Sequence, residues 1–292
     1  MRIMEQIKNS QLTVEIADHG AELVSVKDAQ GKEYLWQADP KYWGRHSPIL
    51  FPIVGSLWNG VYHVCGKDYP LSRHGFARDM DFHLIAKGDE QVVFALHDSA
   101  ETLKKYPFHF NLAVSYRLKD NELHVVWHVE NPDDKTIWFQ VGGHPAFRVP
   151  DMKQGEPLHG RLRFDNSEPI RRFLAEQGCL DRSRHEEVRT DKGVWSFDTH
   201  SFDNDALVFD HSQIRRIELL DAKGKAVVTV QTKAPALGIW SPSGKDAPFI
   251  CIEPWYGVTD VDGFDGELRD KYLVNQLLPG SSFMSEYVIT IG

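Results

Sequence analysis

Hydrophobic and polar residues alternate along most of this chain, and the alternation predicts short strands rather than helices. The run "ELHVVWHVE" (122–130) shows the pattern most clearly. On a strand, Leu123, Val125, Trp127 and Val129 share one face and the Glu and His residues share the other, because successive side chains point to opposite sides. This is the pattern of a strand with one buried and one wet side.

The same alternation, interrupted by polar turns, recurs from the first residues to the last. It predicts hairpins over 82–98, 110–134 and 214–232, three strands within 12–37 and a closing strand over 282–292. Helical signals are weak: "SAETLKKYPF" predicts about one or two turns, with Ser99 as the cap and Pro107 as the stop. The polar, irregular region 152–199 predicts long loops. We therefore expect an all-β fold, a large antiparallel β-sandwich with few short helices, formed by residues 1–292 as a single domain.

Composition narrows the possible partners. Hydrophobic residues make up 41% of the 292 residues, which is enough for a sizeable core. The net charge of −9, from 33 Lys+Arg against 42 Asp+Glu, argues against nucleic-acid binding, which requires a basic face. No apolar run approaches the ~20 residues of a membrane span. Three cysteines without a pairing pattern and a start without a secretory signal lead us to expect a cytoplasmic protein.

Fourteen histidines suggest metal binding, but no segment supports it. His124 and His128 belong to the alternating strand described above, where the wet face explains them. The segment "TDVDGFDGELRD" resembles a calcium loop only at Asp260 and Asp262, because its next ligand position holds Phe264 and its glycine position holds an aspartate. We expect no metal site, and we expect this segment to be an acidic surface loop.

Three other segments place ionisable side chains where a strand meets glycine or proline. His144 lies in "QVGGHPAF", His74 in "LSRHGFARDM" and Glu253 in "FICIEPWYGVTD". Each residue has an ordinary structural explanation, as a turn histidine or an edge carboxylate. All three follow apolar or strand-like segments and adjoin glycine or proline, as expected for residues that line a pocket at the ends of strands in a rigid sheet. We expect the two glycines before His144 to let the backbone turn so that the ring faces a pocket.

Five sequence motifs, taken together and in order, are more specific than any one of them. The segments "RHSPILFPIVG", "HGFARD", "GGHPAF", "DALVF" and "CIEPWYGVTD", in this order, resemble the aldose 1-epimerase (galactose mutarotase-like) family, and its LacX-like branch in particular. The resemblance implies a β-supersandwich and an isomerase that interconverts the α and β anomers of a free hexose. It also implies a small-molecule sugar as the partner, no cofactor, and a monomer or homodimer.

The resemblance further implies roles for individual residues. His144 falls on the general acid, Glu253 on the general base and His74 on a second histidine near the ring oxygen of the sugar. Arg45 and Asp205 fall on substrate-binding positions. Glycine stands at position 238, where galactose mutarotases proper have a sugar-binding glutamine, so galactose specificity is not implied.

Aromatic side chains beside these motifs are candidates for a surface against the apolar face of a sugar. The candidates are Phe76, Phe147, Trp240, Trp255 and Tyr256. For the acid and base, we expect mutual attraction to lower the pKa of Glu253 and to raise that of His144, which would give a bell-shaped pH dependence.

Three alternatives remain open at the level of sequence. Arg45, Arg73 and Arg78 could bind a phosphate, which would make the protein a hexose-6-phosphate 1-epimerase. A non-catalytic sugar-binding protein could have the same fold, since fold does not fix function. A glycosidase would need two carboxylates, for which only Glu253 and Asp205 offer themselves.

Overall fold

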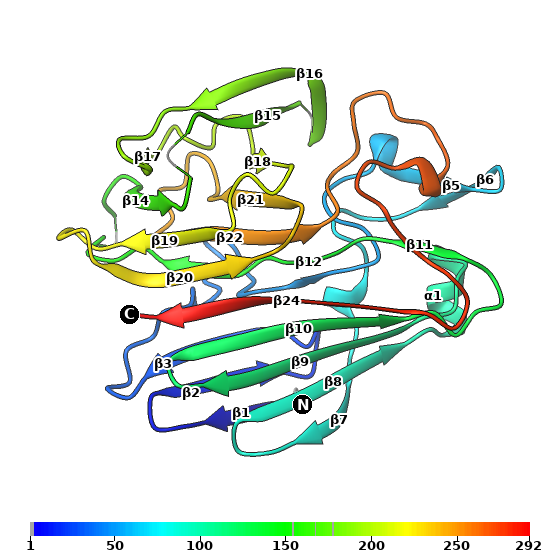
Figure 1. The fold of residues 1–292 in the computed structure, drawn as a ribbon, viewed down its shortest axis with the longest axis horizontal. Coiled ribbons are helices and arrows are strands. Elements are labelled where there is room, and N and C mark those ends of the chain that lie inside the picture. Colours follow the sequence, from blue (N-terminus) through cyan, green and yellow to red (C-terminus); the bar gives the residue numbers. More distant parts are fainter. Residues whose placement is uncertain (1–2, 154, 167, 177) are drawn as a thin grey trace.

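Two large antiparallel sheets dominate the computed structural model, which describes residues 3–153, 155–166, 168–176 and 178–292. The nine-stranded sheet has C-terminal β24 at its centre, between β20 and β10 (Figure 1). In order across the sheet, its strands are β17 (Val194–Asp198), β14 (His159–Phe164), β19 (Arg216–Leu220), β20 (Ala226–Thr232), β24 (Ser282–Ile291), β10 (Glu122–Glu130), β9 (Asn111–Lys119), β8 (Gln91–His97) and β7 (His83–Lys87).

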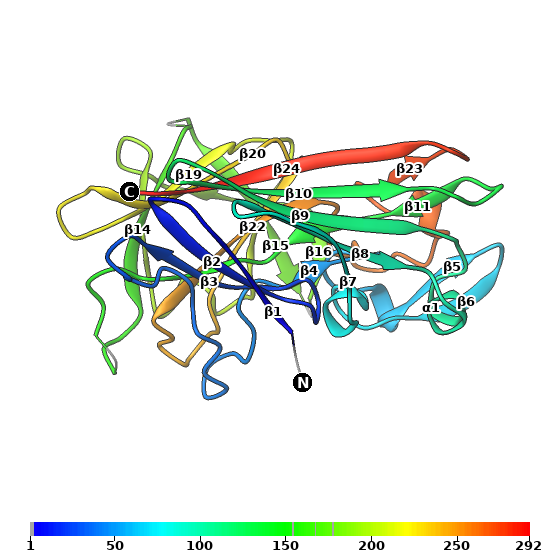
Figure 2. The ribbon, with the colours of Figure 1, turned by 90° about the horizontal axis from the view of Figure 1, so that it is seen from below.

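The second large sheet has eight strands and holds the candidate site. Across the sheet these are β16 (Cys179–Val188), β15 (Ile170–Glu176), β18 (Leu207–Phe209), β21 (Ala236–Trp240), β22 (Phe249–Tyr256), β12 (Val141–Gly143) and β4 (Ile49–Leu50), while β13 (Ala146–Arg148) also pairs with β22. In Figure 2 the labelled strands of this sheet, β22, β15, β16 and β4, lie beneath β24, β10 and β9. Buried side chains of both sheets form one continuous hydrophobic core. The predicted all-β antiparallel sandwich is confirmed.

Smaller elements complete the fold. A three-stranded sheet is formed by β1 (Met4–Lys8), β2 (Leu12–Ala17) and β3 (Leu23–Asp28), and two further pairs are β5 (Val61–Val64) with β6 (Lys67–Pro70) and β11 (Ile137–Phe139) with β23 (Asn275–Leu277). Helix α1 (Ala100–Lys105) is joined by three 3₁₀ turns, at Trp58–Gly60, Ala77–Asp79 and Leu268–Asp270. Within the described ranges, no helix is long and apolar enough to cross a membrane.

Most of the expected local structure is present. Along β10 the buried positions alternate with wetter ones, as predicted. The three hairpins appear as β7–β8, β9–β10 and β19–β20. Helix α1 has the predicted cap: Ser99 Oγ accepts from the Thr102 backbone N–H, and Thr102 Oγ1 accepts from the Ser99 backbone N–H.

One regional prediction was wrong. The segment 152–199 does not consist of long loops but contributes β14, β15, β16 and β17. In the middle of β16, successive side chains on both faces of the strand are exposed to solvent. Its sequence therefore does not alternate between polar and apolar residues as that of a half-buried strand does. Hydrogen bonding to β15 defines this strand instead.

Candidate active site

A pocket of about 250 Å³ opens on the eight-stranded sheet near the middle of β22. Six of the seven predicted site residues line it: His74, Arg78, His144, Asp205, Glu253 and Trp255. These residues are far apart in the sequence, and the sheet brings them together. Arg45 does not line the pocket. Its guanidinium pairs with Asp79, at 2.7 Å, and donates to the Arg78 carbonyl.

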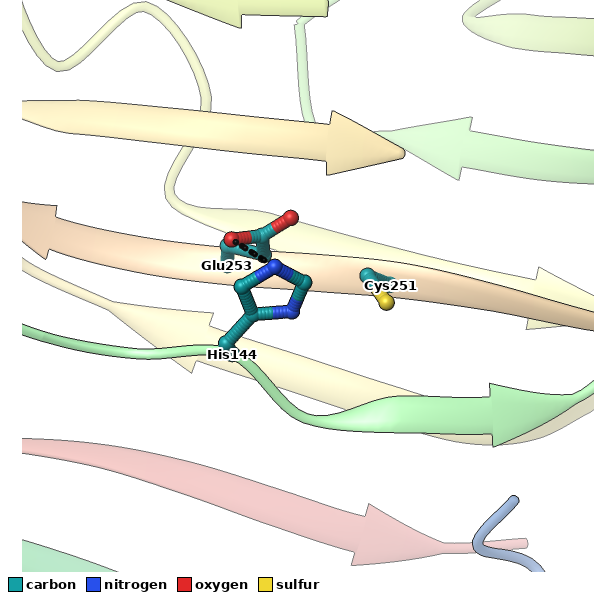
Figure 3. A group of neighbouring side chains, drawn as sticks. All are labelled: His144, Cys251 and Glu253. Atoms are coloured by element: carbon teal, nitrogen blue, oxygen red, sulfur yellow. Dashed lines mark ion pairs between the residues drawn. The ribbon is translucent and has the colours of Figure 1, made fainter. Parts of the chain in front are cut away.

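The centre of the pocket is a contact between His144 and Glu253. His144 follows β12 and precedes β13, and both of these strands pair with β22, which carries Glu253. Figure 3 shows the imidazole ring directed at the carboxyl group, with Cys251 on the same strand beside them. His144 Nε2 lies 3.2 Å from Glu253 Oε2, and the two side chains are only 8% and 1% exposed. The pair is therefore held by backbone pairing and is almost fully withdrawn from bulk water.

Burial reverses the pKa shifts expected for this pair. Desolvation raises the pKa of Glu253 well above its usual value, with a further contribution from the charge of Asp205. Desolvation also lowers the pKa of His144 to about 3. The expectation of a lowered Glu and a raised His was wrong, because mutual attraction is smaller than the cost of burying either charge. At pH values between the lowered pKa of His144 and the raised pKa of Glu253, the two side chains together hold one proton.

His74 is held in a strained turn. Its φ is 68°, and its backbone N–H donates to the Gly55 carbonyl while the Gly55 N–H donates to its Nδ1, at 3.0 Å. A neutral ring with Nδ1 as acceptor carries its proton on Nε2. Burial holds the pKa of His74 well below its usual value, so the ring is a neutral donor. Gly75 (φ 72°) completes the turn, where a Cβ would overlap the Phe51 carbonyl.

The pocket arginines already have acceptors. Arg73 pairs with Asp205 at 3.0 Å and donates to Ser56 Oγ at 2.8 Å. Arg78 donates to the Arg73 carbonyl at 2.6 Å, and burial lowers its pKa to about 10. Asp205 itself has a φ of 71°, an uncommon conformation for a residue other than glycine. This strained aspartate lines the pocket as part of an ion pair.

Aromatic side chains surround His144. The Trp43 ring stacks on the imidazole with centroids 4.8 Å apart, and Trp240 meets it edge-on at 5.8 Å. Trp43 was not among the predicted site residues, although it lies two residues before the "RHSPILFPIVG" motif. Of the five aromatic candidates, only Trp240 and Trp255 line the pocket. The other three, Phe76, Phe147 and Tyr256, pack in or against the hydrophobic core.

The glycines before His144 have a different purpose from the one expected. Both belong to extended β12, and neither has a left-handed φ. A Cβ on Gly142 would lie 2.9 Å from the Trp255 ring, and one on Gly143 would lie 3.1 Å from the Tyr287 ring. These glycines permit close packing, then, and do not make a turn.

A buried ion pair supports one wall of the pocket. Asp260 and Lys271 pair with side chains only 2% and 1% exposed, so the expectation of a surface loop was wrong at Asp260. The Asp260 backbone N–H donates to the Ser56 carbonyl, at 2.9 Å, and its carbonyl accepts from the Leu180 N–H, at 2.7 Å. Neighbouring Thr259 accepts from the Ser56 N–H and donates to the Gly178 carbonyl. These hydrogen bonds connect Ser56, Gly178 and Thr259, which form this wall of the pocket.

Comparisons with known proteins identify the family of the chain. The aldose 1-epimerase family model matches residues 5–261. The chain is 35% identical to the chromosomal LacX protein of Lactococcus lactis subsp. lactis, with 98% of each chain covered. A solved galactose mutarotase related enzyme from Lactobacillus acidophilus is 38% identical, with a TM-score of 0.93, over 99% of this chain and 97% of that one. A galactose mutarotase-like protein from Lactobacillus casei ATCC 334 is 33% identical, with a TM-score of 0.92, over 99% and 100%.

Proposed function

Since the chain belongs to the aldose 1-epimerase family, we propose that it is a mutarotase that interconverts the α and β anomers of a neutral free hexose. The observation that carries the proposal is the buried pair of His144 and Glu253, 3.2 Å apart at the pocket. Mutarotation needs one base to take the proton of the C1 hydroxyl and one acid to protonate the ring oxygen. It needs no hydride, phosphate or metal.

In this mechanism Glu253 is the base and His144 is the acid. The pair holds one proton, which rests on Glu253 when no sugar is bound, because burial disfavours both charges. A small rotation aligns Nε2 with Oε2 and passes that proton to the imidazole. The carboxylate then accepts the C1 hydroxyl proton while the imidazolium protonates the ring oxygen. After rotation about the C1–C2 bond, the reverse steps close the ring on the other face.

Two neighbours would assist these steps. His74, protonated on Nε2, can donate a hydrogen bond to a sugar oxygen but is too weak a base to supply a proton itself. Asp205, held by Arg73, can accept hydrogen bonds from sugar hydroxyls. Both roles orient the substrate, so loss of either residue is expected to reduce turnover without abolishing it.

The charges in the pocket favour a neutral sugar over a sugar phosphate. A phosphate-binding arginine has to offer free N–H groups. Here Arg73 pairs with Asp205 and donates to Ser56, and Arg45 pairs with Asp79 outside the pocket. Arg78 donates to the Arg73 carbonyl, and its buried Nε has no hydrogen-bond partner within the described residues. A hexose 6-phosphate would have to displace these acceptors and approach the charge of Asp205.

Two further alternatives are less well supported. A binding protein would not need an acid and a base buried in contact with one another. A glycosidase would need Asp205 as its second carboxylate, but this carboxylate is ion-paired at 3.0 Å with Arg73. The histidines would have no role in that reaction.

The test is to follow exchange between the anomers of glucose and galactose by NMR, with glucose 6-phosphate as a parallel substrate. Glu253→Gln and His144→Asn should each reduce kcat by about 10²–10⁴-fold, because each removes one partner of the proton transfer. Wild-type turnover of a neutral sugar should exceed that of the phosphate. Full activity of either variant on every aldose tested would refute the proposal, and a preference for the phosphate would favour the epimerase of sugar phosphates.

We also propose that the chain acts as a single domain in the cytoplasm, as a monomer or homodimer. The nine-stranded sheet supports one domain, because it combines strands from the first half of the chain with β24 from its end. Cys65, Cys179 and Cys251 are free thiols, as expected in a reducing compartment.

A further inference from the structure

The indole of Trp255 lies in a groove of the eight-stranded sheet, here called the trench, where Gly142 and Gly238 leave room for the ring because they have no side chains. Strand β22 carries Trp255 between β12 and β21. In the sheet register, Gly142 of β12 lies opposite Trp255, and Gly238 of β21 lies opposite Glu253. A Cβ on Gly238 would lie 2.6 Å from the benzene portion of the indole, and one on Gly142 would lie 2.9 Å from its pyrrole portion. Any other residue on either side would force the ring out of place.

Glycine inside a strand is costly, since it loses more conformational freedom on folding than any other residue. Two such glycines, on opposite sides of one side chain, indicate that the position of this indole matters. Trp255 is 3% exposed, and its ring borders the pocket. It offers little surface for a sugar to stack on.

The indole N–H has no well-aligned hydrogen-bond acceptor, and the adjacent base has no well-aligned donor at one oxygen. Trp255 Nε1 and Glu253 Oε2 are both buried, and neither meets the geometry of a hydrogen bond within the described residues, although Oε2 also lies 3.2 Å from His144 Nε2. The two residues occupy alternate positions of β22, so their side chains lie on the same face of the sheet. A buried donor and a buried acceptor without partners are each unfavourable, and here they are neighbours.

We propose that Trp255 is a positioning residue whose Nε1–H donates a hydrogen bond to the Glu253 carboxylate in the working state, when the proton of the pair is on His144. This inference rests on the proposed function, because it assigns the indole to the base of that reaction. The bond holds one carboxylate oxygen and leaves the other free to take the proton of the C1 hydroxyl. The trench of Gly142 and Gly238 fixes the direction of the donor.

The electrostatics agree with this geometry. Burial is the main cause that raises the pKa of Glu253, and the charge of Asp205 adds to it. Hydrogen bonding from the Trp255 side chain and the charge of Arg73 act in the opposite direction and lower the pKa of Glu253. A hydrogen bond that strengthens as charge develops on the carboxylate lowers the barrier without tightening the binding of sugar.

The decisive experiment replaces Trp255 with benzothienylalanine, in which sulfur takes the place of the indole N–H while the ring shape is kept. NMR anomer exchange then gives kcat and KM. We expect kcat to fall about ten- to hundred-fold, as for loss of a hydrogen bond to a charged group, and KM to change less than about two-fold. Trp255→Phe should show the same division, and Trp195→Phe, a ring packed away from the pocket, should leave both constants unchanged.

Other outcomes separate this inference from the proposed function. If Glu253→Gln is inactive but the benzothienylalanine protein retains the wild-type kcat, Glu253 remains the base and the role of Trp255 is refuted. A rise in KM at constant kcat would also refute it and would make Trp255 a sugar-stacking residue. If Glu253→Gln itself is fully active, the proposed function fails, and this inference fails with it.

Discussion

Replacing Lys271 with methionine tests whether the buried ion pair supports the pocket wall. The substitution keeps the length of the side chain but leaves the Asp260 carboxylate, 2% exposed, without its counter-charge. The backbone N–H of Trp58, at 2.8 Å from Asp260 Oδ2, would remain as a partner. Removing one member of a buried pair costs about 3–5 kcal/mol, because a buried charge is left uncompensated. At about 2 °C per kcal/mol for a chain of this size, Lys271→Met should lower Tm by roughly 6–10 °C.

Thermal unfolding followed by circular dichroism measures this change. Lys104→Met is the matched control, because Lys104 pairs with Glu101 at the surface, with side chains 68% and 76% exposed, and should change Tm by less than about 1 °C. A double variant with Asp260→Asn and Lys271→Met removes both charges and keeps an acceptor for Trp58, so it should recover at least half of the loss. A Tm within 2 °C of wild type for Lys271→Met, or no recovery in the double variant, would refute the reasoning.

Three further predictions concern the site and its turn. Burial lowers the pKa of His144 to about 3 and raises that of Glu253, so the pair holds one proton across neutral pH. The kcat measured by NMR exchange should therefore not change with pH in this range, and a step near the usual histidine pKa would mean that His144 titrates normally. Trp43→Ala should reduce kcat by about two- to ten-fold through loss of the ring stacked on His144, measured in the same assay, and an unchanged kcat would show that the stack is not needed. Gly75→Ala should lower the free energy of unfolding in urea by about 2–5 kcal/mol, because backbone strain at a positive φ and overlap of the new Cβ with the Phe51 carbonyl add. Gly224→Ala is the control, with the same sign of φ but open space around it, and should cost about 1–2 kcal/mol. Equal losses would show that the overlap contributes nothing.

Sequence reasoning succeeded where a local pattern reports on the environment directly. The alternation along β10 predicts its buried face because every second side chain meets the core. Glu253 stands out because a carboxylate that interrupts four apolar residues needs an explanation. His74 and His144 stand out for their glycine and proline neighbours. In each case the information lies within about ten residues of the chain.

Other features depend on partners that are distant in sequence, and no local pattern identifies those partners. Lys271 looks like any surface lysine until the fold places it against Asp260. Trp43 becomes part of the site only through its stack on His144. The pKa shifts of the acid and base were predicted with the wrong sign because sequence gives the charges but not their burial. Gly238 lacks a visible purpose until the Trp255 ring is seen beside it.

The place of β24 in the nine-stranded sheet has a consequence for biosynthesis. This strand comes after all the others in chain order, yet it lies between β20 and β10 and pairs with both. Until the ribosome has released it, β10 and β20 each present an unpaired edge, which is a template for aggregation. The sheet is therefore expected to close only once β24 has emerged from the ribosome, and a nascent chain that stalls before Ser282 should depend on chaperones to stay unaggregated.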